Sequence, residues 1–257
     1  MIEVDNLSHH FADKPCLCDV SFRLGAGEKV VLLGSNGSGK STLLKILDGL
    51  ITAAKGTVHY AGEAISPRSL RQGPLRRRFR QEVALLFQNP DVMLFNPTVH
   101  DEIAFGPRQL GWSGIDERVA HWADLVGVTP FLKRPPFTLS GGEKQKVALA
   151  ALLAVEPKLL LLDEPAAALD PRSSGWLVDF LADLPITLLT TTHNLGLAPE
   201  LGNRALVLGE DHRLLHDGPI EAFLADTERL IAANLVHAHR HRHGGVEHRH
   251  WHTHDWQ

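Results

Sequence analysis

A glycine-rich loop constrains the fold of this chain more than any other feature of its sequence. Residues 34–41, GSNGSGKS, match the phosphate-loop pattern G-x-x-x-x-G-K-[ST]. The pattern lies between an apolar run at residues 29–33, expected to be a strand, and a segment from about Gly39 expected to be a helix. A flexible Gly/Ser loop is the alternative, and the flanking strand and helix argue against it. The sequence therefore predicts a strand–loop–helix unit that binds phosphate groups.

Each part of this loop has a task in phosphate binding. Glycines let the backbone curl so that successive N–H groups face the phosphates, and the helix N-terminus adds a partial positive charge. Lys40 can reach the β- and γ-phosphates of a nucleotide, and the Ser41 hydroxyl can join a Mg²⁺ shell. We therefore expect ATP and Mg²⁺ as ligands. The expected binding residues are Gly34, Ser35, Asn36, Gly37, Ser38, Gly39, Lys40, Ser41 and Thr42.

Four apolar runs in the chain share a common plan. Each has the continuous apolar character of a strand covered on both faces, which favours a parallel sheet with flanking helices. Each also leads into a polar segment at its C-terminal end, where open α/β sheets bind ligands. The runs are residues 29–33 before the phosphate loop, 83–87 before Gln88, 159–162 before Asp163 and Glu164, and 186–192 before His193.

The third run ends in two acidic residues that follow four leucines directly. Asp163 is placed to hold Mg²⁺, usually through water, because Mg²⁺ resists full dehydration. Glu164 would polarise the attacking water in phosphoryl transfer, where positioning and charge stabilisation carry the catalysis. Taken alone, two acids after a strand are more typical of a solvated turn. Together with the phosphate loop they predict the catalytic end of an ATPase, in which Lys40 also takes part.

Two further subdomains are predicted around the sheet. β-like alternation at residues 2–7, 19–24 and 57–60 predicts an N-terminal antiparallel β subdomain. Residues 95–156 carry helical spacing, which predicts an inserted α-helical subdomain. The expected fold is therefore α/β, of the phosphate-loop nucleoside triphosphatase (RecA-like) type, with a mostly parallel sheet and flanking helices.

The expected nucleotide-binding domain spans residues 1–235. Within its helical subdomain, we expect helices at residues 116–127 and 140–156. Its last part is predicted to be a hairpin at residues 209–218, followed by a helix through about residue 235.

Composition excludes several classes of protein. The net charge of -4 argues against a general nucleic-acid binder, which would show a basic excess. The longest apolar run, residues 147–155, is far shorter than the roughly 20 residues of a spanning helix. The N-terminus, MIEVD, lacks the pattern of a signal peptide. Cys16 and Cys18 are the only cysteines, which is typical of a reduced cytoplasmic protein, with a Cys-x-Cys metal site as the alternative.

The C-terminal segment, residues 236–257, changes composition abruptly. Eight of the chain's 16 histidines lie there, in two alternating runs around Gly244 and Gly245, and we expect a flexible, disordered tail. Neutral imidazoles suit Zn²⁺ and Ni²⁺ and, less tightly, Co²⁺, so the preferred interpretation is weak metal capture. A purification tag and inert low-complexity sequence are the alternatives. The expected ligands are His237, His239, His241, His243, His248, His250, His252 and His254.

A second glycine motif carries a family resemblance. Ser140 with Glu143 three residues later forms a capping box, and the Gly141-Gly142 helix start exposes bare N–H groups that fit a γ-phosphate. The segment LSGGE closely resembles the signature motif of ABC ATPases. That resemblance implies that two subunits sandwich two ATP molecules, with this helix contacting the ATP of the partner subunit. The family often has Gln in place of Glu143 and Arg in place of Lys146, differences that bear on rate and coupling.

Four more residues take roles by the same resemblance. Phe11 resembles the aromatic residue that stacks on adenine, with His10 as a competitor and an ordinary apolar strand residue as the alternative. Gln88 resembles the glutamine that senses Mg²⁺ and the transmembrane partner. Asp170, in Ala168-Leu169-Asp170, resembles the loop residue that contacts the opposite site across the dimer. His193 resembles the switch histidine that touches the γ-phosphate.

The type of ABC subunit is indicated by residues 87–111. The segments FQNPD, LFNPTV, AFGP and LG are similar to energy-coupling-factor ATPases, which power importers of cobalt, nickel and vitamins. The resemblance implies a homodimer or paired ATPase on a transmembrane scaffold with a substrate-binding membrane component, at the cytoplasmic face of the membrane. The histidine tail favours nickel or cobalt over a vitamin. A metal-storage or metallochaperone protein and a soluble regulatory ABC ATPase are the alternatives.

An arginine cluster precedes this region. Its members are Arg68, Arg71, Arg76, Arg77, Arg78 and Arg80. We interpret the cluster mainly as a solvated surface, with contact to acidic lipid headgroups or to a partner as the alternative.

Overall fold

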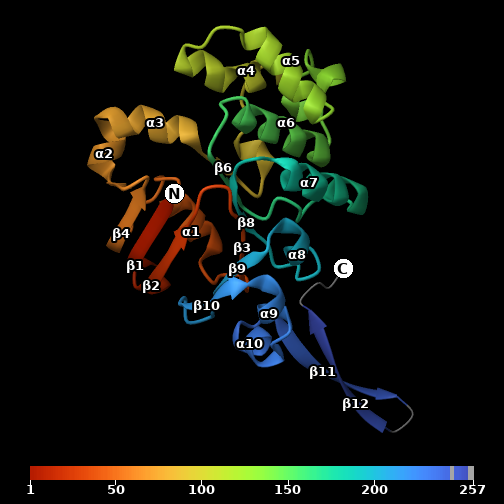
Figure 1. Ribbon diagram of the computed structural model, residues 1–257. Coiled ribbons are helices and arrows are strands. Elements are labelled where there is room, and N and C mark those ends of the chain that lie inside the picture. Colours follow the sequence, from red (N-terminus) through yellow and green to blue (C-terminus); the bar gives the residue numbers. More distant parts are fainter. Residues whose placement is uncertain (244–245, 254–257) are drawn as a thin grey trace. The chain divides into compact units, whose positions relative to one another are not determined.

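The chain forms two compact units, and the second is inserted in the sequence between two segments of the first. The computed structural model describes the backbone of residues 1–243 and 246–253, and the side chains of residues 1–73 and 75–236. Unit 1 consists of Met1–Ile65 and Leu189–Gln257, and unit 2 is Ser66–Leu188. Figure 1 traces both units along the chain.

Unit 1 begins with an antiparallel sheet of four strands in the order β2-β1-β4-β5. The strands are β1 (Ile2–Phe11), β2 (Lys14–Leu24), β4 (Lys55–Tyr60) and β5 (Glu63–Ala64). The alternate residues Ile2 and Val4 are buried, and burial resumes at Leu7 after an irregularity in the strand at the exposed Asp5 and Asn6. The predicted N-terminal β subdomain is therefore confirmed, although β1 and β2 extend well beyond the predicted strands.

The second part of unit 1 carries the phosphate loop. Strand β3 (Lys29–Gly34) precedes the loop, and helix α1 (Lys40–Leu47) follows it. β3 pairs in parallel with β9 (Arg204–Leu208), and β9 pairs antiparallel with β10 (Leu214–Pro219). Val30 to Leu33 are completely buried, as expected for a strand covered on both faces.

The end of unit 1 corrects the prediction of a single helix after the hairpin. The short helix α8 (Ala198–Leu201) precedes β9. After the hairpin, instead of one helix reaching residue 235, there are the two short helices α9 (Ile220–Leu224) and α10 (Thr227–Ala232). Asp226 separates the last two because its side chain accepts the N–H of Arg229 and begins a new helix.

The backbone of the histidine-rich tail is described for most of its length. Strands β11 (Val236–His243) and β12 (Val246–Thr253) form an antiparallel two-stranded sheet. Histidines at every second position give the period of two that is typical of a strand, whereas the low-complexity composition favours a flexible chain. Gly244, Gly245 and residues 254–257 lie outside the described residues.

Unit 2 is mainly helical. Helices α4 (Val99–Leu110), α5 (Ile115–Leu125) and α6 (Gly141–Leu153) pack around an apolar cluster that includes Ile103, Val119 and Val147. The short 3-10 turns η1 (Pro90–Val92), η2 (Thr129–Phe131) and η3 (Pro136–Thr138) connect them, and α7 (Pro171–Asp183) follows. The predicted helical segment thus contains three helices around a core of its own.

Two parallel strands complete unit 2. β6 (Val83–Leu86) pairs with β7 (Leu159–Leu162), and both are buried throughout. β8 (Thr187–Thr191) crosses the division between the units: the Thr187 N–H donates to the Lys158 carbonyl in unit 2, and the Thr192 N–H donates to the Leu32 carbonyl in unit 1. The parallel pairing predicted from apolar runs is therefore observed in both units.

The arginine cluster lies on helices that the sequence did not reveal, α2 (Pro67–Arg71) and α3 (Pro74–Glu82). Arg77 donates to the Leu110 carbonyl at 2.7 Å, and Arg78 lies 3.5 Å from Glu82. Most of the cluster is exposed, in keeping with a solvated surface. Among the described residues, no helix is long and apolar enough to span a bilayer.

Candidate functional site: a phosphate loop and a carboxylate pair

The phosphate loop of unit 1 has the predicted strand–loop–helix form. The Ser38 N–H donates to the Ser35 carbonyl at 3.2 Å, and the Leu43 N–H donates to the Gly39 carbonyl at 2.9 Å. Gly37 and Gly39 adopt φ values of 83° and 110°, a region that favours glycine. These conformations curl the chain between β3 and α1, so the glycines are required by the backbone itself.

Gly39 is also where the loop approaches β2 most closely. A Cβ at this position would overlap the carbonyl oxygen of Cys16 and lie 2.9 Å from Cδ2 of Leu17. Thr42 reinforces the same contact, since its Oγ1 accepts a hydrogen bond from Cys16 Sγ at 3.1 Å. The first turn of α1 is therefore anchored on β2, which fixes where the helix N-terminus points.

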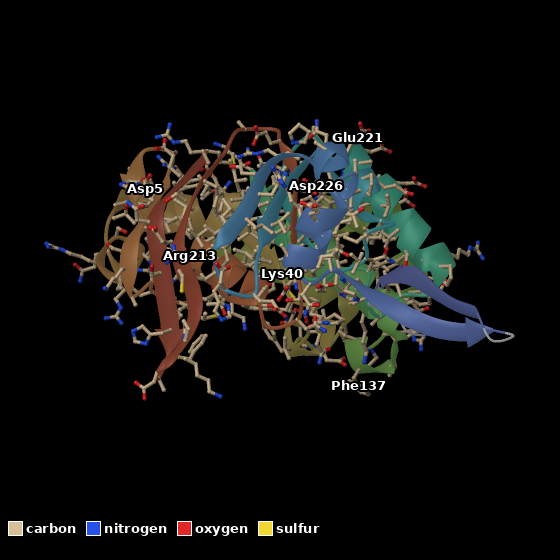
Figure 2. All side chains as sticks on the ribbon, turned by 90° about the horizontal axis from the view of Figure 1, so that it is seen from below. Asp5, Lys40, Phe137, Arg213, Glu221 and Asp226 are labelled. Atoms are coloured by element: carbon tan, nitrogen blue, oxygen red, sulfur yellow. The ribbon has the colours of Figure 1, made fainter. Side chains whose placement is uncertain are left out.

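Lys40 is the first residue of α1 and is labelled in Figure 2. Its Nζ donates to the Gly34 carbonyl at 2.7 Å and to the Ser35 carbonyl at 3.1 Å. Lys40 is only 6% exposed, so the loop holds a largely desolvated positive charge. A buried ammonium at the N-terminus of a helix is suited to a phosphate chain.

One contact of the loop had no signal in the sequence. Nδ1 of His212 lies 3.3 Å from the Ser38 carbonyl, and the His212 carbonyl accepts the Cys18 N–H. Because 174 residues separate His212 from Ser38, only the pairing of β9 and β10 reveals this neighbour.

Two other predicted residues of unit 1 lie at strand ends. Phe11 ends β1, is 52% exposed, and its ring packs edge-on against His9 at 4.8 Å between centroids. His193 follows β8 and is half-buried. The next residue, Asn194, accepts the N–H groups of Gly196 and Leu197 and turns the chain toward α8.

In unit 2, the carboxylates of Asp163 and Glu164 directly follow β7. They are 5% and 9% exposed, so both side chains are largely removed from water. The Asp163 N–H donates to the Leu86 carbonyl of β6, which extends the parallel ladder to this residue. Glu164 has a φ of 48°, an unusual backbone conformation for a residue with a side chain. This conformation ends the extended run of β7 at the carboxylate pair.

Gln88, two residues after β6, is exposed. Its surroundings are ordered by local contacts: the Phe87 N–H donates to Sδ of Met93 at 3.4 Å, and Asn89 accepts the N–H of Asp91. Asp91 in turn forms an ion pair with Lys144 of α6 at 2.7 Å. The loop after β6 is thereby tied to the helix that follows the second glycine motif.

The second glycine motif forms the capping box predicted for it. Ser140 Oγ accepts the Glu143 N–H at 3.4 Å, and Glu143 accepts the Ser140 N–H at 2.7 Å. The hydrogen bond from the Ser140 backbone lowers the pKa of Glu143 below its usual value. A Cβ on Gly141 would meet open space, so the start of α6 is not crowded at this position.

Asp170 has a structural role in unit 2. It caps α7 by accepting the N–H groups of Arg172 and Ser173 at 3.0 and 3.1 Å. The hydroxyl of Ser173 also donates to it, which is the main reason that the pKa of Asp170 is lowered.

The metal predictions have different outcomes. Cys16 and Cys18 are free, and no cluster of three or more possible metal ligands occurs among the side chains that the structure describes. The side chains of the predicted tail ligands lie outside the described part of the chain, and His254 lies outside it entirely.

Each unit carries groups of a kind that a nucleoside triphosphatase needs. In unit 1, Lys40 and the loop N–H groups are of the type that binds phosphate oxygens, and Ser41 carries a hydroxyl. In unit 2, Asp163 carries a carboxylate, the type of oxygen ligand that Mg²⁺ prefers. These features define a phosphate-loop nucleoside triphosphatase.

Comparison with known proteins identifies the family. The ABC transporter family matches residues 17–167. A protein of Methanosarcina acetivorans, provisionally named an ABC transporter ATP-binding protein, is 42% identical over 95% of this chain and 92% of its own length. A similarly named protein of Gloeobacter violaceus is 43% identical over 90% of this chain and 94% of its own length.

Solved structures agree with this result. The cbiO1 protein of Clostridium perfringens, part of the ABC transporter complex cbiONQ, has a TM-score of 0.76 and 28% identity over 91% of this chain and 94% of its own. An ATP-binding cassette dimer with ADP and Pi shares the fold, with a TM-score of 0.76, 23% identity and coverage of 86% of this chain and 99% of its own. This chain belongs to the ABC transporter family, as an ATP-hydrolysing subunit coupled to transport.

Proposed function

We propose that this chain powers an energy-coupling-factor type importer of nickel or cobalt ions. The observation that carries the proposal is the similarity to cbiO1 across nearly the whole chain. Two features of the sequence support it: the motifs of residues 87–111, and a tail in which eight histidines alternate with other residues. Imidazole is a good ligand for both metals, so the tail favours a metal over a vitamin.

The proposed catalytic roles follow from the chemistry of the buried side chains. Lys40 binds the β- and γ-phosphates, Ser41 and Gln88 contribute to the Mg²⁺ shell, and Asp163 holds Mg²⁺ through water. Mg²⁺, when bound, neutralises charge on the phosphate oxygens. Glu164 orients and polarises the attacking water. His193 contacts the γ-phosphate, and Phe11 packs against the adenine.

A second subunit completes the proposed arrangement. ABC ATPases work as dimers with membrane components, and we assign Ser140, Gly141, Gly142 and Asp170 to the partner's nucleotide. The glycine-containing start of α6 supports this role, because there is open space beside Gly141 and helix N-termini bind anions. We favour a homodimer, since one chain carries both glycine motifs.

The membrane scaffold is proposed to dock on unit 2. Phe95 is 67% exposed and Phe137 is 79% exposed; Figure 2 shows Phe137 projecting from the ribbon. The buried carboxylate of Glu102 accepts the N–H groups of Phe95 and Asn96 at 2.9 and 2.7 Å, which holds the Phe95 backbone in place. Phe95 also packs edge-on against Phe105. An ordered, exposed aromatic surface of this kind suits a protein partner at the cytoplasmic face of the membrane.

Ser140→Ala tests the role of the second glycine motif. Loss of the cap should destabilise the chain by about 1 kcal/mol and should lower ATP turnover by about tenfold or more, because the start of α6 is no longer fixed. Phosphate release and urea unfolding measure the two effects.

The chain contains a matched control for this change. Ser66 forms the same capping box at the start of α2. Ser66→Ala should therefore cost similar stability and leave turnover unchanged. Equal turnover in the two variants would show that Ser140 acts only as a cap.

Elemental analysis of cells that depend on the transporter tests the proposed substrate. Cells carrying Glu164→Gln should contain less nickel or less cobalt than wild-type cells, while other metals stay constant. Unchanged levels of both metals would contradict metal import and favour a vitamin importer. A metal-storage protein would instead lose cellular metal when the tail is removed and keep it with Glu164→Gln.

A further inference from the structure

The two strands of the C-terminal hairpin bring histidines opposite one another. The register pairs His237 with His252, His239 with His250, and His241 with His248. Figure 1 shows β11 and β12 running side by side. Residues directly opposite in an antiparallel pair share a face, and so do residues two apart along a strand. All three pairs therefore belong to one face of the hairpin.

The other face offers little to hold the strands together. It contains Arg240 opposite Arg249, Arg242 opposite Glu247, and Ala238 opposite Trp251. Like charges directly opposite each other destabilise a sheet, and an isolated two-stranded hairpin is marginal in water. The hairpin therefore needs a further source of stability, and its histidine face is the place where a ligand can supply it.

Cross-strand spacing matches the requirements of a metal ion. Opposite Cβ atoms lie about 4.5–5.5 Å apart, which allows two imidazole nitrogens to approach one ion at about 2.0–2.1 Å. Neighbouring pairs on one face are separated by roughly 7 Å along the strand, so each pair can hold an ion of its own. At neutral pH most imidazoles are unprotonated, which leaves their nitrogens available.

We propose that the cross-strand histidine pairs of the β11–β12 hairpin bind a borderline divalent transition-metal ion such as Ni²⁺, and that binding orders the hairpin. Coordination would supply the stability that the arginine-rich face lacks, because binding free energy becomes folding free energy when ligands assemble on metal binding. This site goes beyond the proposed transport role and needs neither ATP nor a membrane partner.

Two variants that each lose two histidines test the register. His237→Ala/His252→Ala removes one outer pair and leaves two pairs intact. His237→Ala/His248→Ala breaks both outer pairs and leaves only the central one. Ni²⁺ binding to the full chain, purified without an added tag, is measured at pH 7.5 by equilibrium dialysis without nucleotide. The first variant should keep roughly two thirds of the wild-type Ni²⁺ and the second roughly one third, whereas independent histidines would give equal losses.

The same measurement can overturn the proposal. Equal Ni²⁺ binding by the two variants would show that the histidines act as an unpaired chain, and no binding by the wild-type chain would exclude the site. Neither result would contradict the proposed transport function. That function is tested separately by the metal content of cells carrying Glu164→Gln, which depends on ATP turnover.

Discussion

The Glu164→Gln variant is expected to bind ATP normally and to release phosphate about 10²–10⁴ times more slowly than the wild-type chain. The amide has nearly the same size and shape as the carboxylate, so the sharp turn at residue 164, with its φ of 48°, should survive. What the substitution removes is the group proposed to polarise water. Steady-state phosphate release and a fluorescent-nucleotide binding assay measure the two quantities separately.

A control variant separates catalysis from simple loss of charge. Glu117→Gln removes one carboxylate from an exposed position in the first turn of α5, in the same unit. It should hydrolyse ATP at the wild-type rate. If Glu164→Gln also retained the wild-type rate, Glu164 would not be the group that activates water.

The sequence was most informative where a function depends on neighbouring residues. The phosphate loop, the acidic pair after β7 and the capping box of α6 each lie within about ten consecutive residues, and the structure places each in its predicted element. Such segments are predictable because their residue types meet local backbone requirements, such as positive φ at Gly37 and Gly39.

Contacts between distant segments had no comparable signal. Nothing in the sequence indicated that Thr42 would accept a hydrogen bond from Cys16, or that His212 would lie beside Ser38. These pairs depend on strand pairing, and strand pairing depends on long-range packing. Cys16 was therefore considered as a metal ligand, although the structure shows it as a support for the loop.

The sequence pattern also failed to predict secondary structure in arginine-rich and polar segments. α3 combines four arginines with few apolar residues, so its helical period is weak in the sequence, although Leu75 and Phe79 are buried. The turn between β1 and β2 lacks the Asn-Gly or Gly-Gly pair that is typical of tight hairpins. Ala12, which rarely adopts a positive φ, takes the φ of 50° that this turn requires. In both cases tertiary packing overrides a weak local preference.

The Gly39→Ala variant is expected to lose ATP binding by more than about 100-fold and to unfold with a free energy about 2–4 kcal/mol lower. Two costs combine at this position. Alanine is strained at a φ of 110°, and its Cβ would overlap the Cys16 carbonyl oxygen. To relieve the overlap, the loop must move away from β2 and carry the start of α1 with it. Lys40 and the loop N–H groups would then no longer converge on the same phosphates.

Gly27→Ala distinguishes strain from overlap. Gly27 also has a positive φ, of 77°, but a Cβ there has nothing within 4 Å. This variant should lose only about 1–2 kcal/mol, from the left-handed backbone alone, and should bind ATP like the wild type. Urea unfolding and nucleotide titration of both variants measure the difference. If Gly39→Ala matched Gly27→Ala in both assays, the close approach of the loop to β2 would not be what holds the phosphate site in shape.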